Sequence, residues 1–200
     1  KRIENDDHAI VLIVGDLLEN ATIGSKSCVY RQVMTPQKQK EETIEDLYPI
    51  RDKIKSINMG NHCERTLRQT GNDIMYDVCL GLDLCDIYSK IFTYITLNIG
   101  KATYKIYTTH NLGKSEAKLI KAAKSFNDID LLIGGHIHTP KHLTVAQKTC
   151  GGKQRDIEVI ICNAWLLDED YSVSAAYEPV SLKPIFARLY KDNKKIEIIS

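Results

Sequence analysis

Residues 9–16 read Ala-Ile-Val-Leu-Ile-Val-Gly-Asp. A short, unbroken apolar run that is rich in β-branched residues and closed by glycine is typical of a buried parallel strand. Further strands are expected at residues 56–59 and 130–133, and helices at residues 36–55, 63–69, 72–80 and 115–126. Pro49 is expected to kink the first of these helices. The alternation of strand and helix predicts an α/β fold.

The rest of the chain is rich in β-structure. Residues 91–99 and 102–109 predict a hairpin around Gly100-Lys101, since two alternating runs flank a two-residue turn. Later strands are expected at residues 142–149, 155–162, 183–190 and 194–199. We therefore expect two packed mixed β-sheets flanked by helices, in one domain that spans residues 1–200.

Composition limits the classes of function. The chain has 200 residues, of which 43% are hydrophobic and 26% are charged, and this is typical of a soluble globular domain. Its net charge of +1 provides no global attraction for nucleic acid or anionic lipid. The apolar run at residues 9–14 is much shorter than the ~20 residues of a membrane helix. Six cysteines without a CxxC pair favour free thiols and a cytoplasmic protein, in the host cytoplasm if it is phage-encoded.

Polar residues follow the ends of several expected strands. Asp16 ends the first strand, Asn61 and His62 follow the second, His110 follows the hairpin, and the sequence Gly135-His136-Ile137-His138 follows the strand at 130–133. Ligand sites of open α/β sheets lie beyond the carboxyl ends of the strands. We therefore expect these side chains to converge on one site.

The residue types indicate a metal site. Imidazole, carboxylate and amide oxygen together suit Mn, Fe or Zn. Each signal alone has a simpler interpretation, because Gly-Asp is usually a turn and a single histidine such as His110 is usually a core residue. His136 and His138 are a sharper signal, since alternate residues of an extended segment point to the same side.

The order GDxxEN, GNHxxR, a single histidine and GHxH resembles the calcineurin-like metallophosphoesterase superfamily, in the form found in phage and bacterial members. The resemblance covers residues 9 to about 140, and Trp165 resembles an aromatic residue near the tail of those members. It implies a four-layer αββα fold and hydrolysis by in-line attack of a metal-bridging hydroxide.

The resemblance also implies roles for particular residues. Asp16 would bridge two divalent cations; Asn61, His110 and His136 would complete one metal site, and His138 would belong to the other. Both Asp16 and His62 would be catalytic, with His62 binding the phosphate and assisting the leaving group, and Asn61 and Arg65 would also contact substrate. Manganese is the first expectation for the cations, with Fe, Zn, Ni or Mg as alternatives.

Two departures from the family pattern are clear. The family has Asp-x-His at the end of an earlier strand, whereas Asp6-Asp7-His8 precedes the first apolar run and is expected to be a surface turn. We therefore expect the family's first strand to lie upstream of Lys1, so that the domain is N-terminally incomplete. Cys63 replaces the acidic residue that usually follows GNH, and is expected to be an inert packed thiol rather than an oxidation-sensitive one.

The expected activity is therefore hydrolysis of phosphodiesters, with nucleic acid as the substrate class that the resemblance suggests. The alternatives are a phosphomonoesterase acting on nucleotides or phosphoproteins, and a non-catalytic scaffold that keeps the fold. Formation of a homo-oligomer stays open. Arg68 and a helical stripe of lysines are expected to be solvated, with contact to a nucleic-acid backbone as the alternative for the stripe; its members are Lys114, Lys118, Lys121 and Lys124.

Overall fold

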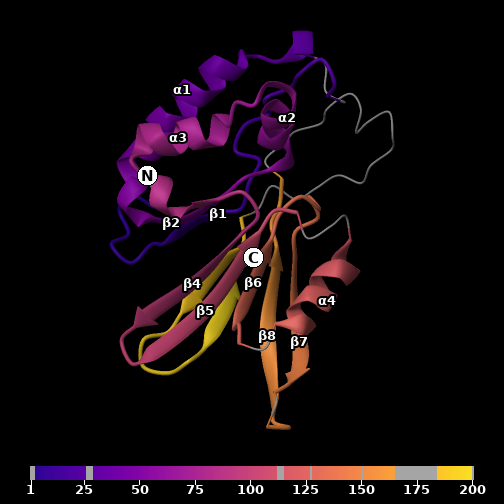
Figure 1. The fold of residues 1–200 in the computed structure, drawn as a ribbon. Helices are drawn as coiled ribbons and strands as arrows, with labels where there is room; N and C mark the ends of the chain where they lie inside the picture. The colour runs from indigo at the N-terminus through magenta and orange to yellow at the C-terminus, as the bar shows by residue number, and fades with distance from the viewer. Residues whose placement is uncertain are drawn as a thin grey trace. The chain divides into compact units, whose positions relative to one another are not determined.

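The structure, a computed structural model, describes residues 3–25, 29–111, 115–126, 128–149, 151–164 and 184–199. It is an α/β structure with mixed β-sheets flanked by helices, as the sequence predicted (Figure 1). Its described residues form two compact units, residues 3–93 and residues 94–164 with 184–199. Each unit has its own hydrophobic core. Three residues named in the sequence analysis lie outside the described residues, Lys1, Lys114 and Trp165, as do two of the six cysteines, Cys28 and Cys150.

The first unit contains a parallel sheet with the strand order β1-β2-β3. The strands are β1 (Val11–Ile13), β2 (Ile54–Asn58) and β3 (Tyr88–Ser89). Its helices are α1 (Pro36–Leu47), α2 (Asn61–Thr70) and α3 (Ile74–Leu82). Short 3-10 helices occupy Val29–Arg31, Tyr48–Lys53 and Cys85–Ile87. The boundaries of α2 and α3 lie close to the predicted ones, since Gly71 ends α2 in the left-handed conformation that glycine favours.

The first core lies between the sheet and the helices. Ile57 of β2 and Met75 and Val78 of α3 are completely buried, and Ile44 of α1 packs against this core. Helices α1 and α3 lie side by side (Figure 1). The core therefore holds β1 and β2 in a rigid frame, whose carboxyl ends carry Gly15 and Gly60.

The predicted helix at residues 36–55 is wrong in its second half. The α-helix ends at Leu47, a 3-10 helix follows at Tyr48–Lys53, and β2 begins at Ile54 rather than Ser56. Pro49 has no N–H to donate and a proline ring conflicts with the carbonyl four residues earlier in an α-helix, so the α-helix ends before it instead of kinking. The start is as predicted, because Thr35 caps the helix and accepts a hydrogen bond from the amide of Lys38.

The second unit contains a five-stranded sheet with the order β4-β5-β6-β8-β7. Its strands are β4 (Phe92–Ile99), which starts at the boundary between the units, β5 (Ala102–Thr109), β6 (Leu131–Gly134), β7 (Lys141–Lys148) and β8 (Gln154–Ile161). The predicted hairpin is present, since the two residues that join β4 to β5 leave room only for an antiparallel pair. The sheet is mixed, because β6 runs parallel to β5 and β8 while β7 is antiparallel to β8.

Helix α4 (Glu116–Ser125) packs against β7 and β8 (Figure 1). Leu119 and Ala123 are its buried residues, and Ile120 packs at the edge of the same core. Ser115 stands at the predicted N-cap, but its side chain makes no capping hydrogen bond. The C-terminal strands β9 (Phe186–Leu189) and β10 (Ile196–Ile199) form a separate antiparallel pair.

The described cysteines are free thiols, as the sequence predicted: Cys63, Cys79, Cys85 and Cys162. None of the helices in the described part of the chain has the length and apolar character needed to cross a bilayer.

Candidate functional site

In the first unit, the parallel register between β1 and β2 brings two sequence motifs together. Ile13 pairs with Ile57, so the chain leaves both strands at the same edge of the sheet. Gly15 and Asp16 follow β1, with φ angles of 87° and 50°. Gly60 and Asn61 follow β2, and Asn61 is the first residue of α2. The edge therefore carries the predicted residues of both motifs.

Position 60 must be glycine because Asp16 lies too close for any side chain there. A Cβ atom at position 60 would lie 2.0 Å from Oδ1 of Asp16 and 2.1 Å from its main-chain nitrogen. Atoms of this kind cannot approach so closely, and the nitrogen cannot move without displacing the loop. The glycine of GNH thus permits the close approach of α2 to the loop that holds Asp16.

The Asp16 carboxylate caps α2. The amide of His62 donates a hydrogen bond to Oδ1 of Asp16 at 3.0 Å, whereas the N-cap residue Gly60 has no side chain for this purpose. The first amides of a helix lack partners within the helix, and its N-terminus carries partial positive charge. A carboxylate from another strand end therefore meets both needs, and Asp16 and His62 are held together.

The His62 imidazole lies between two carboxylates. Its Nδ1 is 3.1 Å from Oε2 of Glu19, and its Nε2 is 3.7 Å from Oδ2 of Asp16. Burial lowers the pKa of His62, but the hydrogen bond to Glu19 and the charges of Asp16 and Glu19 outweigh it, so the pKa is raised above its ordinary value. The Glu19 carboxylate is therefore positioned to orient the His62 ring, a role that the cysteine at position 63 does not fill.

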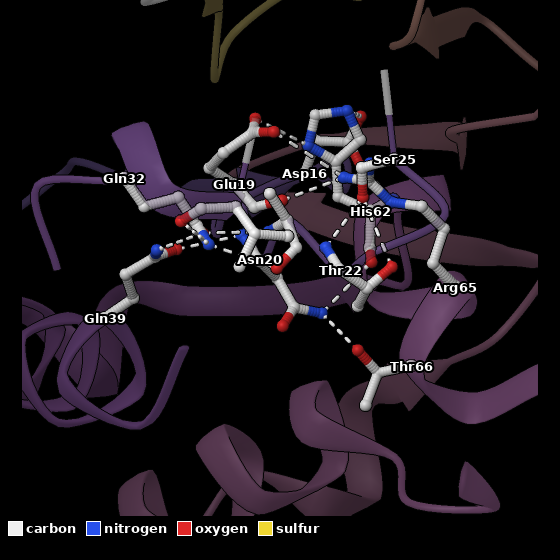
Figure 2. A network of polar contacts seen from close by, with 12 residues as sticks. Asp16, Glu19, Asn20, Thr22, Ser25, Gln32, Gln39, His62, Arg65 and Thr66 are labelled. Carbon is white, nitrogen blue, oxygen red and sulfur yellow. Dashed lines mark hydrogen bonds and ion pairs between the residues drawn. The ribbon is translucent and has the colours of Figure 1, made fainter. Parts of the chain in front are cut away.

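Sequence reasoning missed Glu19 and Asn20 as site residues. Asn20 is 1% exposed, and its Nδ2 donates to the His62 carbonyl at 3.1 Å and to Oγ1 of Thr66 at 2.7 Å (Figure 2). Both residues belong to the quoted GDxxEN pattern, three and four positions after Asp16. The available signal was that a carboxylate and an amide side chain follow the end of a buried strand. Only the fold shows that both of these residues contact His62.

The Cys63 thiol is packed, as expected. It is fully buried on α2, and burial, with a smaller effect of the Asp16 charge, raises its pKa to about 12. A thiol that stays protonated near neutral pH is a poor nucleophile and resists oxidation. The structure therefore favours packing as the role of Cys63.

The two arginines of α2 differ in their environment. Arg65 is 22% exposed; its NH2 group donates to the Glu19 carbonyl at 2.9 Å and lies 3.7 Å from the Glu19 carboxylate. Arg68 is 75% exposed and pairs with Glu64 one turn earlier. Arg68 therefore lies on a solvated face, while Arg65 belongs to the cluster around His62.

In the second unit, His110 and His136 lie together. Thr109 of β5 pairs with Gly134 of β6, so the residues that follow these parallel strands are neighbours. The ring centroids of His110 and His136 are 5.3 Å apart with an edge-on arrangement, and ligand nitrogens of the two rings lie within 4.8 Å. His110 is 3% exposed. Two imidazoles at this separation suit a shared transition-metal ion.

The predicted extended conformation of the GHxH segment is wrong. His136 and His138 both have left-handed backbones, with φ of 72° and 63°, and the amide of Ile137 donates to the Gly135 carbonyl at 2.9 Å. The chain therefore turns tightly at His136, and its backbone is again left-handed at His138. Side-chain direction here follows from the turn and not from strand alternation.

The segment before β1 is the predicted surface turn. Asp6, Asp7 and His8 are exposed, and the His8 amide donates to Oδ1 of Asp6 at 2.9 Å, a local aspartate turn. Lys53 fastens this turn by donating to the carbonyls of Ile3, Glu4 and Asp6. The turn precedes β1 instead of following a strand.

The described lysines of the predicted stripe on α4 are exposed: Lys118, Lys121 and Lys124. Their solvated state agrees with the expectation, and contact to a nucleic-acid backbone stays a prediction.

Each unit therefore carries side chains of the kinds that could hold a metal ion. The first carries a carboxylate, an amide and a histidine with its own carboxylate partner; the second carries a close pair of imidazoles. No family model matches this chain, and no curated protein matches it.

Proposed function

We propose that this chain is a metal-dependent phosphoesterase of the calcineurin-like type that hydrolyses phosphodiesters, with nucleic acid as the expected substrate class. The proposal includes the four-layer arrangement in which two packed sheets lie between helices. The order of the motifs along the chain is the basis for assigning the residues of both units to one binuclear centre. The donor set of imidazole, carboxylate and amide suits Mn, with Fe, Zn, Ni or Mg as alternatives.

The observation that best supports the proposal is the distribution of left-handed backbone. Among the described residues, five residues other than glycine have positive φ: Asp16, Asn20, Asp83, His136 and His138. Asp83 is the C-cap of α3, where this conformation is ordinary. The other four belong to the motifs. Left-handed backbone costs most residues about 1–2 kcal/mol, and less for Asn and Asp, and it concentrates at functional sites.

The proposed roles follow the chemistry of each group. Asp16 would hold both cations, Asn61, His110 and His136 would hold one of them, and His138 would hold the other. Two divalent cations, when bound, neutralise phosphate charge and activate the attacking water. His62 holds the phosphate and gives a proton to the leaving oxygen, and Glu19 fixes its ring so that Nε2 can serve this purpose.

The exposed turn at residues 6–8 favours a second candidate, a non-catalytic scaffold that keeps the fold. This turn is the only Asp-x-His sequence among the described residues, and it precedes β1. The two candidates differ in measured turnover and not in fold.

The test is hydrolysis of bis-nitrophenyl phosphate and of mono-nitrophenyl phosphate in the presence of Mn²⁺. The expected result is diester cleavage that His62→Ala and His136→Ala reduce by about a hundredfold or more. His8→Ala is the matched control, because that histidine lies in the exposed turn, and it should retain activity. Preferential monoester cleavage would support the phosphomonoesterase alternative.

Metal analysis tests the same proposal without turnover. The purified protein, after dialysis against Mn²⁺, should retain about two ions per chain, and His136→Ala should retain fewer. Retention of less than about one ion per chain would reject the metal centre. Metal retention without cleavage of either phosphoester would leave the scaffold as the better description.

A further inference from the structure

One buried hydrogen-bond donor of the second unit makes no hydrogen bond. Nδ2 of Asn163 is buried, and no atom in the described part of the chain accepts a hydrogen bond from it. It is the only buried side-chain nitrogen or oxygen among the described residues of this unit that lacks a partner. Leaving a buried donor unpaired costs about 1–3 kcal/mol, so native proteins keep few such groups and each one calls for an explanation.

Asn163 follows the strand that lies next to the GHxH segment. Gly134, the last residue of β6, pairs in parallel register with Ile161, the last residue of β8, and the two strands lie side by side (Figure 1). The amide of Cys162 donates to the Gly134 carbonyl at 2.9 Å, so the pairing continues one residue past β8. His136 and Asn163 each stand two residues beyond the paired positions, and they therefore leave the sheet at the same edge.

The neighbouring strand β5 brings the second histidine to this edge. The amide of Gly135 donates to the Thr109 carbonyl at 3.1 Å, and His110 follows directly. The ends of β5, β6 and β8 thus stand in a row, with adjacent strands about 4.8 Å apart. The carboxyl ends of parallel strands are where α/β sheets bind ligands, so the unpaired donor lies at the ligand-binding edge of its own unit.

The chemistry of the donor narrows the class of ligand. An amide nitrogen has no lone pair for a metal ion, and its N–H groups donate to oxygen acceptors. A phosphate oxygen is such an acceptor, and a hydrogen bond to a charged group contributes about 1.5–3 kcal/mol. Asn163 as a whole is partly exposed, and the last side-chain torsion of asparagine has broad minima, so the carboxamide can turn its nitrogen toward a ligand.

We infer that Asn163 is a further phosphate-binding residue, whose Nδ2 donates a hydrogen bond to a phosphate oxygen of the substrate. The inference rests on the proposed function and deepens it, because it adds a substrate contact that none of the sequence motifs contains. The contact is neutral, so Asn163 binds phosphate without competing for the cations and without moving a proton. The histidine pair and the carboxamide therefore serve different parts of the same ligand.

The first test measures phosphate binding without turnover. The protein is dialysed against Mn²⁺ and titrated with inorganic phosphate in a calorimeter. Asn163→Ala should weaken binding about tenfold or more, and Asn163→Asp should weaken it further, because a carboxylate repels phosphate. Asn163→Ala should retain as much Mn²⁺ as the wild type. Asn98→Ala is the matched control, since that asparagine of the same unit accepts a hydrogen bond from Thr103 in the exposed hairpin, and its loss should leave phosphate binding unchanged.

The second test separates ligand binding from a structural role. Asn163→Leu keeps a similar volume and removes the unpaired donor, so in urea without phosphate it should be at least as stable as the wild type. Inorganic phosphate should raise the thermal midpoint of the wild type and raise that of Asn163→Leu less. A carboxamide that held the strand end in place would give the opposite result, a loss of stability without phosphate.

Several outcomes overturn the inference. Unchanged phosphate affinity in Asn163→Ala would reject it, and loss of Mn²⁺ retention in that variant would assign the carboxamide oxygen to the metal site instead. Lower stability of Asn163→Leu without phosphate would assign Asn163 to the fold. Phosphate binding that depends on Asn163, without cleavage of either nitrophenyl ester, would reject only the proposed function. Diester cleavage whose KM is the same in Asn163→Ala would reject only the phosphate contact, and a wild type that binds no phosphate would reject both.

Discussion

The main-chain N–H of His62 donates a hydrogen bond to Oδ1 of Asp16 at 3.0 Å, so the same carboxylate caps α2 and belongs to the candidate metal site. The two residues are 46 positions apart in sequence. The local stability of α2 and the chemistry of the site therefore depend on one side chain.

This relationship predicts different effects for two substitutions of Asp16. Asp16→Ala removes the cap and places alanine in a left-handed backbone, so unfolding in urea should require about 1–2 kcal/mol less free energy. Asp16→Asn keeps an oxygen acceptor and a residue that tolerates φ of 50°, so it should lose less than half of that. Both variants should lose Mn²⁺ retention. Equal destabilisation by the two would contradict the capping role.

Gly60 should tolerate no side chain. Gly60→Ala places a Cβ atom 2.0 Å from Oδ1 of Asp16, and we expect loss of Mn²⁺ retention together with a lower thermal midpoint. The control is Gly151→Ala, where a Cβ atom meets no neighbour within 4 Å. The close approach of α2 to Asp16 would be refuted by a Gly60→Ala protein that retains metal as the wild type does.

His138 is expected to reduce the stability of the fold. Its φ of 63° suits glycine better than histidine, so His138→Gly should be more stable than His138→Ala by about 1 kcal/mol in urea unfolding. Both variants should bind fewer metal ions than the wild type. If the alanine variant is as stable as the glycine variant, the turn is not strained.

Tyr104 should anchor the C-terminal strand pair. Its hydroxyl is buried and lies within hydrogen-bonding distance of the Tyr190, Asn193 and Lys195 main chain. Tyr104→Phe removes the hydroxyl that bonds the Tyr190 carbonyl, while Asn193 and Lys195 keep their main-chain partners, so hydrogen exchange of residues 186–199 should quicken by about one order of magnitude. Tyr94→Phe is the control, since that exposed hydroxyl makes one bond, to the Asp128 carbonyl. Unchanged exchange in Tyr104→Phe would exclude the anchor.

The Cys79 thiol should make the free energy of unfolding decrease as the pH rises in the alkaline range. Burial, with a smaller contribution from Cys85, raises its pKa from 9.0 to about 12. The folded state thus keeps a proton that the unfolded chain releases above about pH 9, so the contribution of Cys79 is complete below that pH and declines toward pH 12. Its share of the slope approaches about 1.4 kcal/mol per pH unit. Urea unfolding between pH 8 and pH 10.5 should show a smaller decline in Cys79→Ala, and identical declines would refute the assignment.

Much of the fold was predictable from local patterns. The apolar run at residues 9–14 and the alternating runs around Gly100 gave correct strands, because each pattern reports the burial of one or both faces of a strand. The error at residues 48–55 came from reading Pro49 as a kink. A proline in the sequence does not reveal that the residues after it will pair with a parallel strand, as β2 pairs with β1.

The sequence proposed members of the candidate site but not the contacts that each of them makes within its own unit. The motifs identified Asp16, His62, His110 and His136 without any contact information, because glycines and strand ends mark where polar side chains can gather. Glu19 and Asn20 were missed since their partner, His62, lies more than 40 positions away. The left-handed turn at His136 and His138 was missed because a strand-end pattern does not specify φ.

The sequence by itself determined most of the strands and helices and which polar residues follow them, since those properties depend largely on near neighbours along the chain. Tertiary structure alone decided that Asp16 caps α2, that Glu19 rather than residue 63 orients His62, and that Gly60 can carry no side chain. These three facts share a physical origin. They arise from the register of β1 against β2, which the cooperative packing of the first core sets and no local pattern encodes.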